Sequence, residues 1–216
     1  MILKYNYLIW SSLFLSFVYL TTMRYPKIKL RWLIKGSSII LLSLFSLFNC
    51  PTSIAYILSI ALLFSAFGDM FLGYNENKFF IHGLVSFLIS HLIYCYIFYS
   101  NLDIFYLKFI LTKSNILILC LLFIHSIIMI KILYPKLQNL KIPVLVYMTA
   151  LIGMSIGSIV SNYSNSYLIF GALLFIASDS ALAIQKFVKS FLGINSFIWI
   201  TYYFAQMFIL FSFLKI

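Results

Sequence analysis

The stretch YLIFGALLFIASDSALAI, residues 167–184, indicates the fold class of this chain. Its 18 residues include one charged side chain, that of Asp179. Eighteen helical residues rise about 27 Å, close to the roughly 30 Å thickness of the hydrocarbon core of a bilayer. The stretch therefore predicts a membrane-spanning helix, because an open strand would leave its backbone polar groups unpaired in lipid.

A second apolar stretch, IALLFSAFGDMFLGY at residues 60–74, also contains a single acidic residue, Asp69. An ionised carboxylate in a membrane helix costs about 2.5–3.5 kcal/mol on insertion scales. The chain has only four acidic residues in 216, and the other two, Glu76 and Asp103, fall in or beside polar stretches. Asp69 and Asp179 are therefore functional candidates, either as an acid/base pair or as structural carboxylates satisfied by polar neighbours.

The composition places the whole chain in the membrane class. It is 64% hydrophobic and 9% charged, whereas a soluble domain has about 25% charged residues. We expect an all-α polytopic bundle of about eight helices, forming a single transmembrane domain over residues 1–216. The expected spans are 5–23, 33–50, 53–74, 80–100, 115–134, 142–161, 165–185 and 194–214. Between the fourth and fifth, DIFYLKFIL (103–111) is expected to lie in the membrane interface as a short amphipathic helix.

The distribution of lysine and arginine predicts the orientation. Eleven of the fifteen fall on one side of the eight spans and four on the other. The side with eleven should be cytoplasmic, so both termini should lie outside. These cations sit in short loops rather than in a continuous stripe, which favours anionic lipid headgroups as partners over nucleic acid. We expect an integral, multi-pass protein of a bacterial inner (cytoplasmic) membrane.

This orientation gives the two aspartates a common depth. Asp69 lies five residues before Tyr74 and Asp179 six residues before Gln185, so both should lie roughly 8–9 Å inside the cytoplasmic edge. Gly68 and Ser178 precede them, and small residues allow helices to approach closely. Lys35 should reach a similar level, either as a lysine that extends to the interface or as a contact for a phosphate headgroup.

The predicted fourth span adds two further candidates. Gly83, Phe87 and His91 recur every four residues and so share one helix face, with Tyr94 close to it. His91 should lie deeper than the aspartates. We therefore expect His91 to contact substrate or support the site rather than carry out the chemistry, with a hydrogen-bonded core histidine as the alternative.

Polar residues in the last two spans have both a functional and a structural interpretation. Tyr202 and Gln206 belong to a polar stripe that could contact substrate or join helices. We expect the serines beside Asp179, including Ser180, to bond to carbonyls of their own helix rather than to act as nucleophiles. No histidine has a sequence relation that would activate either serine.

Five segments together resemble the lysoplasmalogenase family, also called YhhN-like membrane proteins. They are IKGSSIILL (34–42), FGDMFL (67–72), HGLVSFLISHLIY (82–94), FGALLFIASDSALA (170–183) and TYYFAQ (201–206). The resemblance covers nearly the whole chain, although Gly36 stands where the family often has proline. It implies an eight-helix hydrolase that cleaves the vinyl-ether bond of lysoplasmalogens, giving a fatty aldehyde and glycerophosphoethanolamine or glycerophosphocholine. The expected substrate is a lysophospholipid within the bilayer.

The chemistry of this bond suits two carboxylates. A vinyl ether is hydrolysed by proton delivery to its β-carbon, which leaves an oxocarbenium ion that water attacks. One carboxyl group must stay protonated near neutral pH, as burial favours, and an anion must stabilise the cation, as in glycosidases. We therefore expect Asp69 and Asp179 to be catalytic and Lys35, His91, Tyr94, Tyr202 and Gln206 to bind substrate. The reaction requires no metal and no cofactor.

Three other classes have partial support. A proton-coupled transporter of small molecules or lipids could use the same aspartates, although the spans that contain them lack the breaks of discontinuous transporter helices. An intramembrane aspartyl protease would need Gly-x-Gly-Asp, and this chain has Ala66-Phe67-Gly68-Asp69. A zinc hydrolase would need clustered ligands. The three histidines, His82, His91 and His125, are scattered in sequence, and His125 falls in a span with no other motif.

Overall fold

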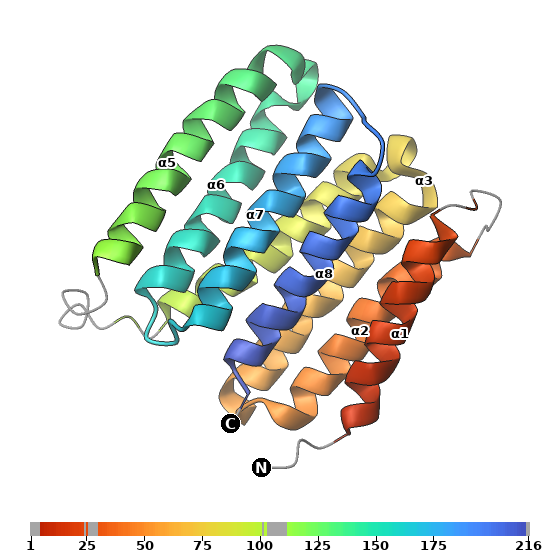
Figure 1. Cartoon of the computed structure of the whole chain (residues 1–216), viewed down its shortest axis with the longest axis vertical. Helices are drawn as coiled ribbons and strands as arrows, with labels where there is room; N and C mark the ends of the chain where they lie inside the picture. The colour runs from red at the N-terminus through yellow and green to blue at the C-terminus, as the bar shows by residue number, and fades with distance from the viewer. Residues whose placement is uncertain (1–4, 24, 26–29, 101, 103–111, 215–216) are drawn as a thin grey trace. The chain divides into compact units, whose positions relative to one another are not determined.

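A computed structural model describes residues 5–23, 25, 30–100, 102 and 112–214. This part of the chain is almost entirely helical and contains no strand, which confirms the all-α prediction (Figure 1). Its α-helices are α1 (Asn6–Thr22), α2 (Arg31–Asn49), α3 (Thr52–Tyr99), α5 (Lys113–Leu133), α6 (Lys141–Val160), α7 (Ser166–Phe187) and α8 (Ile194–Ser212). Two 3₁₀ turns, η1 (Tyr134–Lys136) and η2 (Gln138–Leu140), join α5 to α6.

Helix α3 consists of the predicted third and fourth spans, which run back beside each other (Figure 1). Its backbone leaves the helical region at Asn75 (φ −157°, ψ 95°) and at Phe79 (φ −111°, ψ 15°). The Asn75 side chain accepts a hydrogen bond of 3.1 Å from the amide of Lys78. This is an N-cap, and it explains how the chain stops one helix and starts the next without a proline.

The helices have the dimensions of membrane spans. Six described helices, with α3 counted once and α5 and α6 extended by their 3₁₀ turns, are long and apolar enough to cross a membrane by length and composition. The chain is thus a multi-pass membrane protein, and α1, with 17 residues, is the shortest α-helix among the described residues. The count of about eight spans is approximate, since it includes α1 and both halves of α3.

Helix ends agree with the predicted ends to within two residues. Helix α7 continues to Phe187, two residues beyond the predicted end. Asp179 therefore lies eight residues, or about 12 Å, before the end of its helix, instead of six residues. The expected interfacial helix at 103–111 lies outside the described residues, and the predicted orientation in the membrane stays a prediction. Six cations used for that orientation also lie outside them: Lys4, Arg24, Lys27, Lys29, Lys108 and Lys215.

Backbone contacts divide the chain into two compact units, residues 1–97 with 209–216 and residues 98–208. We call them the first unit and the second unit. The first contains α1, α2 and most of α3. The prediction of a single domain over residues 1–216 stays a prediction.

Small polar residues pack the helices of the first unit. Ser12 of α1 donates to the Ser38 carbonyl of α2 at 2.6 Å, and the hydroxyls of Ser43 on α2 and Ser59 on α3 lie 2.6 Å apart. A serine is small enough to let two backbones approach and can bond across the gap, which is the usual way that membrane helices associate. These contacts bring α2 against the first half of α3, where Asp69 lies.

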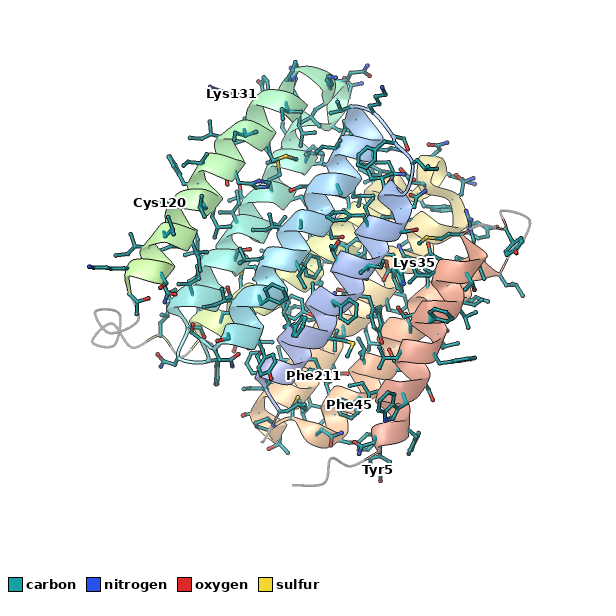
Figure 2. The ribbon with its side chains drawn as sticks, viewed as in Figure 1. Tyr5, Lys35, Phe45, Cys120, Lys131 and Phe211 are labelled. Atoms are coloured by element: carbon teal, nitrogen blue, oxygen red, sulfur yellow. The ribbon has the colours of Figure 1, made fainter. Side chains whose placement is uncertain are left out.

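The second unit contains α5, α6, α7 and α8 as far as Phe208. Helix α6 packs against α7, and α5 packs against both. The Tyr99 hydroxyl donates to the Gly153 carbonyl of α6 at 2.7 Å. Most side chains of α5 are exposed, including those of Cys120 and Lys131 (Figure 2). An exposed apolar helix of this kind suits contact with lipid.

Candidate functional site

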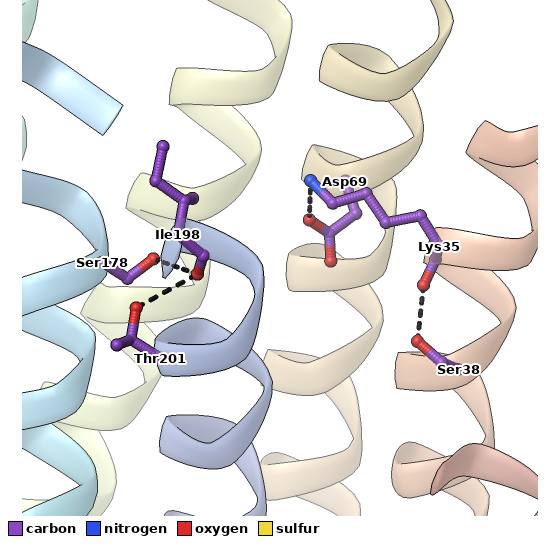
Figure 3. Close-up of polar contacts among 6 residues, drawn as sticks. All are labelled: Lys35, Ser38, Asp69, Ser178, Ile198 and Thr201. Carbon is purple, nitrogen blue, oxygen red and sulfur yellow. Dashed lines mark hydrogen bonds and ion pairs between the residues drawn. The ribbon is translucent and has the colours of Figure 1, made fainter. Parts of the chain in front are cut away.

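Asp69 lies in the first half of α3, six residues before the break at Asn75. Its side chain is only 1% exposed, and one carboxylate oxygen, Oδ1, lies 2.8 Å from Nζ of Lys35 on α2 (Figure 3). The Lys35 side chain is 13% exposed and also lies over the ring of Tyr19, with Nζ 5.8 Å from the ring centroid. Lys35 therefore forms an ion pair with a carboxylate that is almost completely buried.

Glycines around Asp69 permit this close packing. A Cβ atom on Gly68 would lie 2.7 Å from the ring of Phe87, which belongs to the second half of α3. A Cβ atom on Gly36, beside Lys35, would lie 2.5 Å from the side chain of Met70. The prediction of close approach at Gly68 is confirmed, and glycine at position 36 is explained by Met70 in this chain.

The residues around Asp179 on α7 form a second polar site. The carboxylate oxygen Oδ2 of Asp179 accepts a short hydrogen bond from the Tyr147 hydroxyl of α6. The Ser178 hydroxyl donates to the Ile198 carbonyl of α8 at 3.0 Å (Figure 3), and Ser180 Oγ lies 2.9 Å from His125 Nε2 of α5. Three consecutive residues thus bond to three different helices, which the 100° step of a helix makes possible.

These contacts correct one expectation and add His125 to the residues near Asp179. Ser178 and Ser180 bond to neighbouring helices instead of to carbonyls of α7. His125, which has no motif in its own span, contacts the residue next to Asp179. Tyr147 was not predicted at all, and no sequence signal separates it from the rest of the 16 tyrosines of the chain. The only available signal for His125 was a polar side chain within an apolar span.

The predicted His91 and Tyr94 lie deep in the second half of α3. His91 is fully buried, and its Nδ1 lies 2.6 Å from the Phe87 carbonyl. Tyr94 is also fully buried. With Lys35 and Asp69, these residues belong to the first unit. Their roles in substrate binding stay predictions.

The predicted Tyr202 and Gln206 belong to α8 in the second unit, as does Asp179 of α7. Both are buried. The Tyr202 ring packs edge-on against Phe175, with centroids 5.5 Å apart, and at 5.7 Å from the Trp199 ring. Their predicted contact with substrate is likewise untested. In the described part of the chain, no three His, Cys, Asp or Glu side chains are grouped so that they could hold a metal ion.

Comparisons with curated proteins found relatives with a common name. Proteins named lysoplasmalogenase TMEM86A from Bos taurus and Homo sapiens are each 28% identical to this chain over 162 residues. Each alignment covers 71% of this chain and 63% of the relative. A protein named lysoplasmalogenase homolog from Dictyostelium discoideum is 27% identical over 164 residues, covering 64% of this chain and 53% of that protein.

The chain therefore spans less than two thirds of the length of these relatives. No solved structure matches it significantly. The model of the YhhN family matches residues 30–213, which include Asp69 and Asp179. This chain belongs to the YhhN family.

Proposed function

We propose that this protein hydrolyses the vinyl-ether bond of lysoplasmalogens. The observation that carries the proposal is the similarity over most of the chain to proteins named lysoplasmalogenase, within one family. The two aspartate sites support it, because each puts a carboxylate and a polar partner inside an apolar helix bundle. The reaction adds water across one bond and releases a fatty aldehyde and a glycerophospho-headgroup alcohol.

The proposed reaction has two steps with different demands. A carboxylic acid first transfers its proton to the β-carbon of the vinyl ether, and the electron pair of the double bond forms the new C–H bond. The resulting oxocarbenium ion is attacked by water, and the hemiacetal then breaks its C–O bond to the glycerol. A nearby anion lowers the energy of the cation, and a base removes the proton of the attacking water.

Asp69 suits the anionic part of this chemistry. Its Oδ1 lies 2.8 Å from Nζ of Lys35, and its side chain is only 1% exposed. A cationic partner this close stabilises an anionic carboxylate and restricts its orientation. Asp179 is half-buried and accepts a hydrogen bond from the neutral Tyr147 hydroxyl. A carboxyl group can accept such a bond both when it is ionised and when it is protonated. Both residues are proposed to be required for turnover.

The substrate is proposed to enter from the bilayer, with its alkenyl chain among the apolar helices and its phosphate at the membrane surface. The chain carries a net charge of +11, and we propose that its loop cations attract anionic headgroups. The location in a bacterial inner membrane also remains our proposal. An acid-catalysed hydrolysis of this type has no step that calls for a cofactor.

The test uses purified protein in detergent or liposomes with lysoplasmenylethanolamine, and measures fatty aldehyde and glycerophosphoethanolamine. Wild-type protein should release both products in equal amounts. Asp69→Asn and Asp179→Asn, which keep the side-chain volume, should each lower turnover by about 10²- to 10⁴-fold, the usual contribution of an acid/base group. Near wild-type turnover in either variant would remove that residue from the mechanism. Uptake into liposomes without any product would instead favour a transporter.

A further inference from the structure

The hydrogen bond between Tyr147 and Asp179 joins two membrane-spanning helices at a candidate catalytic carboxylate. Tyr147 belongs to α6 and is 8% exposed, and its hydroxyl donates to Oδ2 of Asp179 on α7. Both residues lie in the second unit. Hydroxyl donors to carboxylates are among the stronger hydrogen bonds in proteins.

The two residues next to Asp179 in sequence restrict the rotation of α7 about its own axis, because both bond to other helices. Ser178 bonds to the Ile198 carbonyl of α8, and Ser180 bonds to His125 of α5. These two contacts fix the backbone on either side of Asp179. They leave the side-chain torsions of Asp179 to be set by its own partners, one of which is the Tyr147 hydroxyl.

We infer that Tyr147 is a positioning residue for Asp179 in the proposed hydrolysis. By engaging Oδ2, the Tyr147 hydroxyl turns the carboxyl group so that Oδ1 exchanges the proton with the substrate or with the attacking water. The inference rests on the proposed function and adds to it a residue that sequence reasoning missed. Tyr147 makes no covalent bond and accepts no charge in this role, since it acts by fixing the geometry of Asp179.

The first test compares Tyr147→Phe with Tyr99→Phe. Both substitutions remove a hydroxyl from a tyrosine of the second unit, and the Tyr99 hydroxyl donates to the Gly153 backbone carbonyl instead of to a carboxylate. Tyr147→Phe should lower kcat about 10- to 100-fold, with KM changed less than about threefold, as expected when a catalytic group loses the contact that orients it. Tyr99→Phe should leave kcat within about twofold of wild type.

A second arm separates positioning from a general loss of structure. In an Asp179→Asn background, Tyr147→Phe should lower the residual kcat by less than about threefold, because the carboxylate that Tyr147 positions is already gone. An equal loss in both backgrounds would overturn the inference. So would a Tyr147→Phe protein with kcat within twofold of wild type.

A third experiment uses infrared spectroscopy and does not depend on catalytic activity. The chain has only four acidic residues, so the infrared carboxyl band of Asp179 can be identified by subtracting the spectrum of Asp179→Asn. This band should shift in Tyr147→Phe and keep its position in Tyr99→Phe. A band that does not move in Tyr147→Phe overturns the inference. If wild-type protein releases no aldehyde, the proposed function fails, and the infrared comparison still decides whether Tyr147 holds Asp179.

Discussion

The ion pair between Lys35 and Asp69 leads to a quantitative prediction about stability. At 2.8 Å and an effective dielectric constant near 20, the attraction between the two charges is about 6 kcal/mol. Desolvation of both groups offsets much of this attraction, so the net contribution of the pair to the free energy of unfolding is smaller. Removing only the lysine costs more than the pair contributes, because it leaves a carboxylate with 1% exposure facing an apolar side chain. Lys35→Met should therefore cost about 3–5 kcal/mol of unfolding free energy.

The assay is reversible unfolding in mixed micelles by added SDS, followed by tryptophan fluorescence. Lys131→Met is the matched control, because Lys131 is an exposed lysine on α5 (Figure 2), and its replacement should change stability by less than about 0.5 kcal/mol. Adding Asp69→Asn to Lys35→Met removes the buried charge and should recover more than half of the loss. If Lys35→Met is no less stable than Lys131→Met, the buried ion pair does not contribute as described.

Three further predictions concern packing and hydrogen bonds, and the same unfolding assay measures each. Gly68→Ala should cost about 1–3 kcal/mol, because the new methyl group would lie 2.7 Å from the ring of Phe87; a neutral result would mean that the halves of α3 can separate freely. Asn75→Ala should cost about 1 kcal/mol and Asn75→Asp much less, since aspartate also caps a helix; equal losses would argue against the cap. Ser180→Ala should cost about 0.6 kcal/mol through the bond to His125, and additivity with His125→Ala would show that the pair does not interact.

The sequence predicted the helices well because each span depends only on its own residues. A run of about 20 apolar residues must be a helix in lipid, and its ends follow from where polar residues begin. The polar group NENK at residues 75–78 thus marked the end of one span and the start of the next. Gly68 was also predictable, because a glycine beside a membrane carboxylate has few uses other than close approach.

The partners of the polar residues were harder to predict, because they depend on how each helix is rotated and which helices are neighbours. Lys35 could have extended to the surface, and only the packing of α2 against α3 directs it to Asp69. Ser180 and His125 come from spans 55 residues apart with no shared motif. Tyr147 stands in an apolar run in which a tyrosine fits equally well for packing alone. These contacts are properties of the tertiary structure.

The most direct test of the proposed hydrolysis follows the proton that is delivered to carbon. Purified protein is incubated with lysoplasmenylethanolamine in D₂O, the aldehyde is reduced at once with borohydride, and the resulting alcohol is analysed by mass spectrometry. Free aldehyde held in D₂O for the same time controls for exchange. Hydrolysis through protonation of the β-carbon should give an alcohol with one deuterium on the carbon next to the alcohol carbon, formed by wild-type protein and lost in Asp69→Asn and Asp179→Asn. An alcohol without deuterium, or no aldehyde at all, would contradict it.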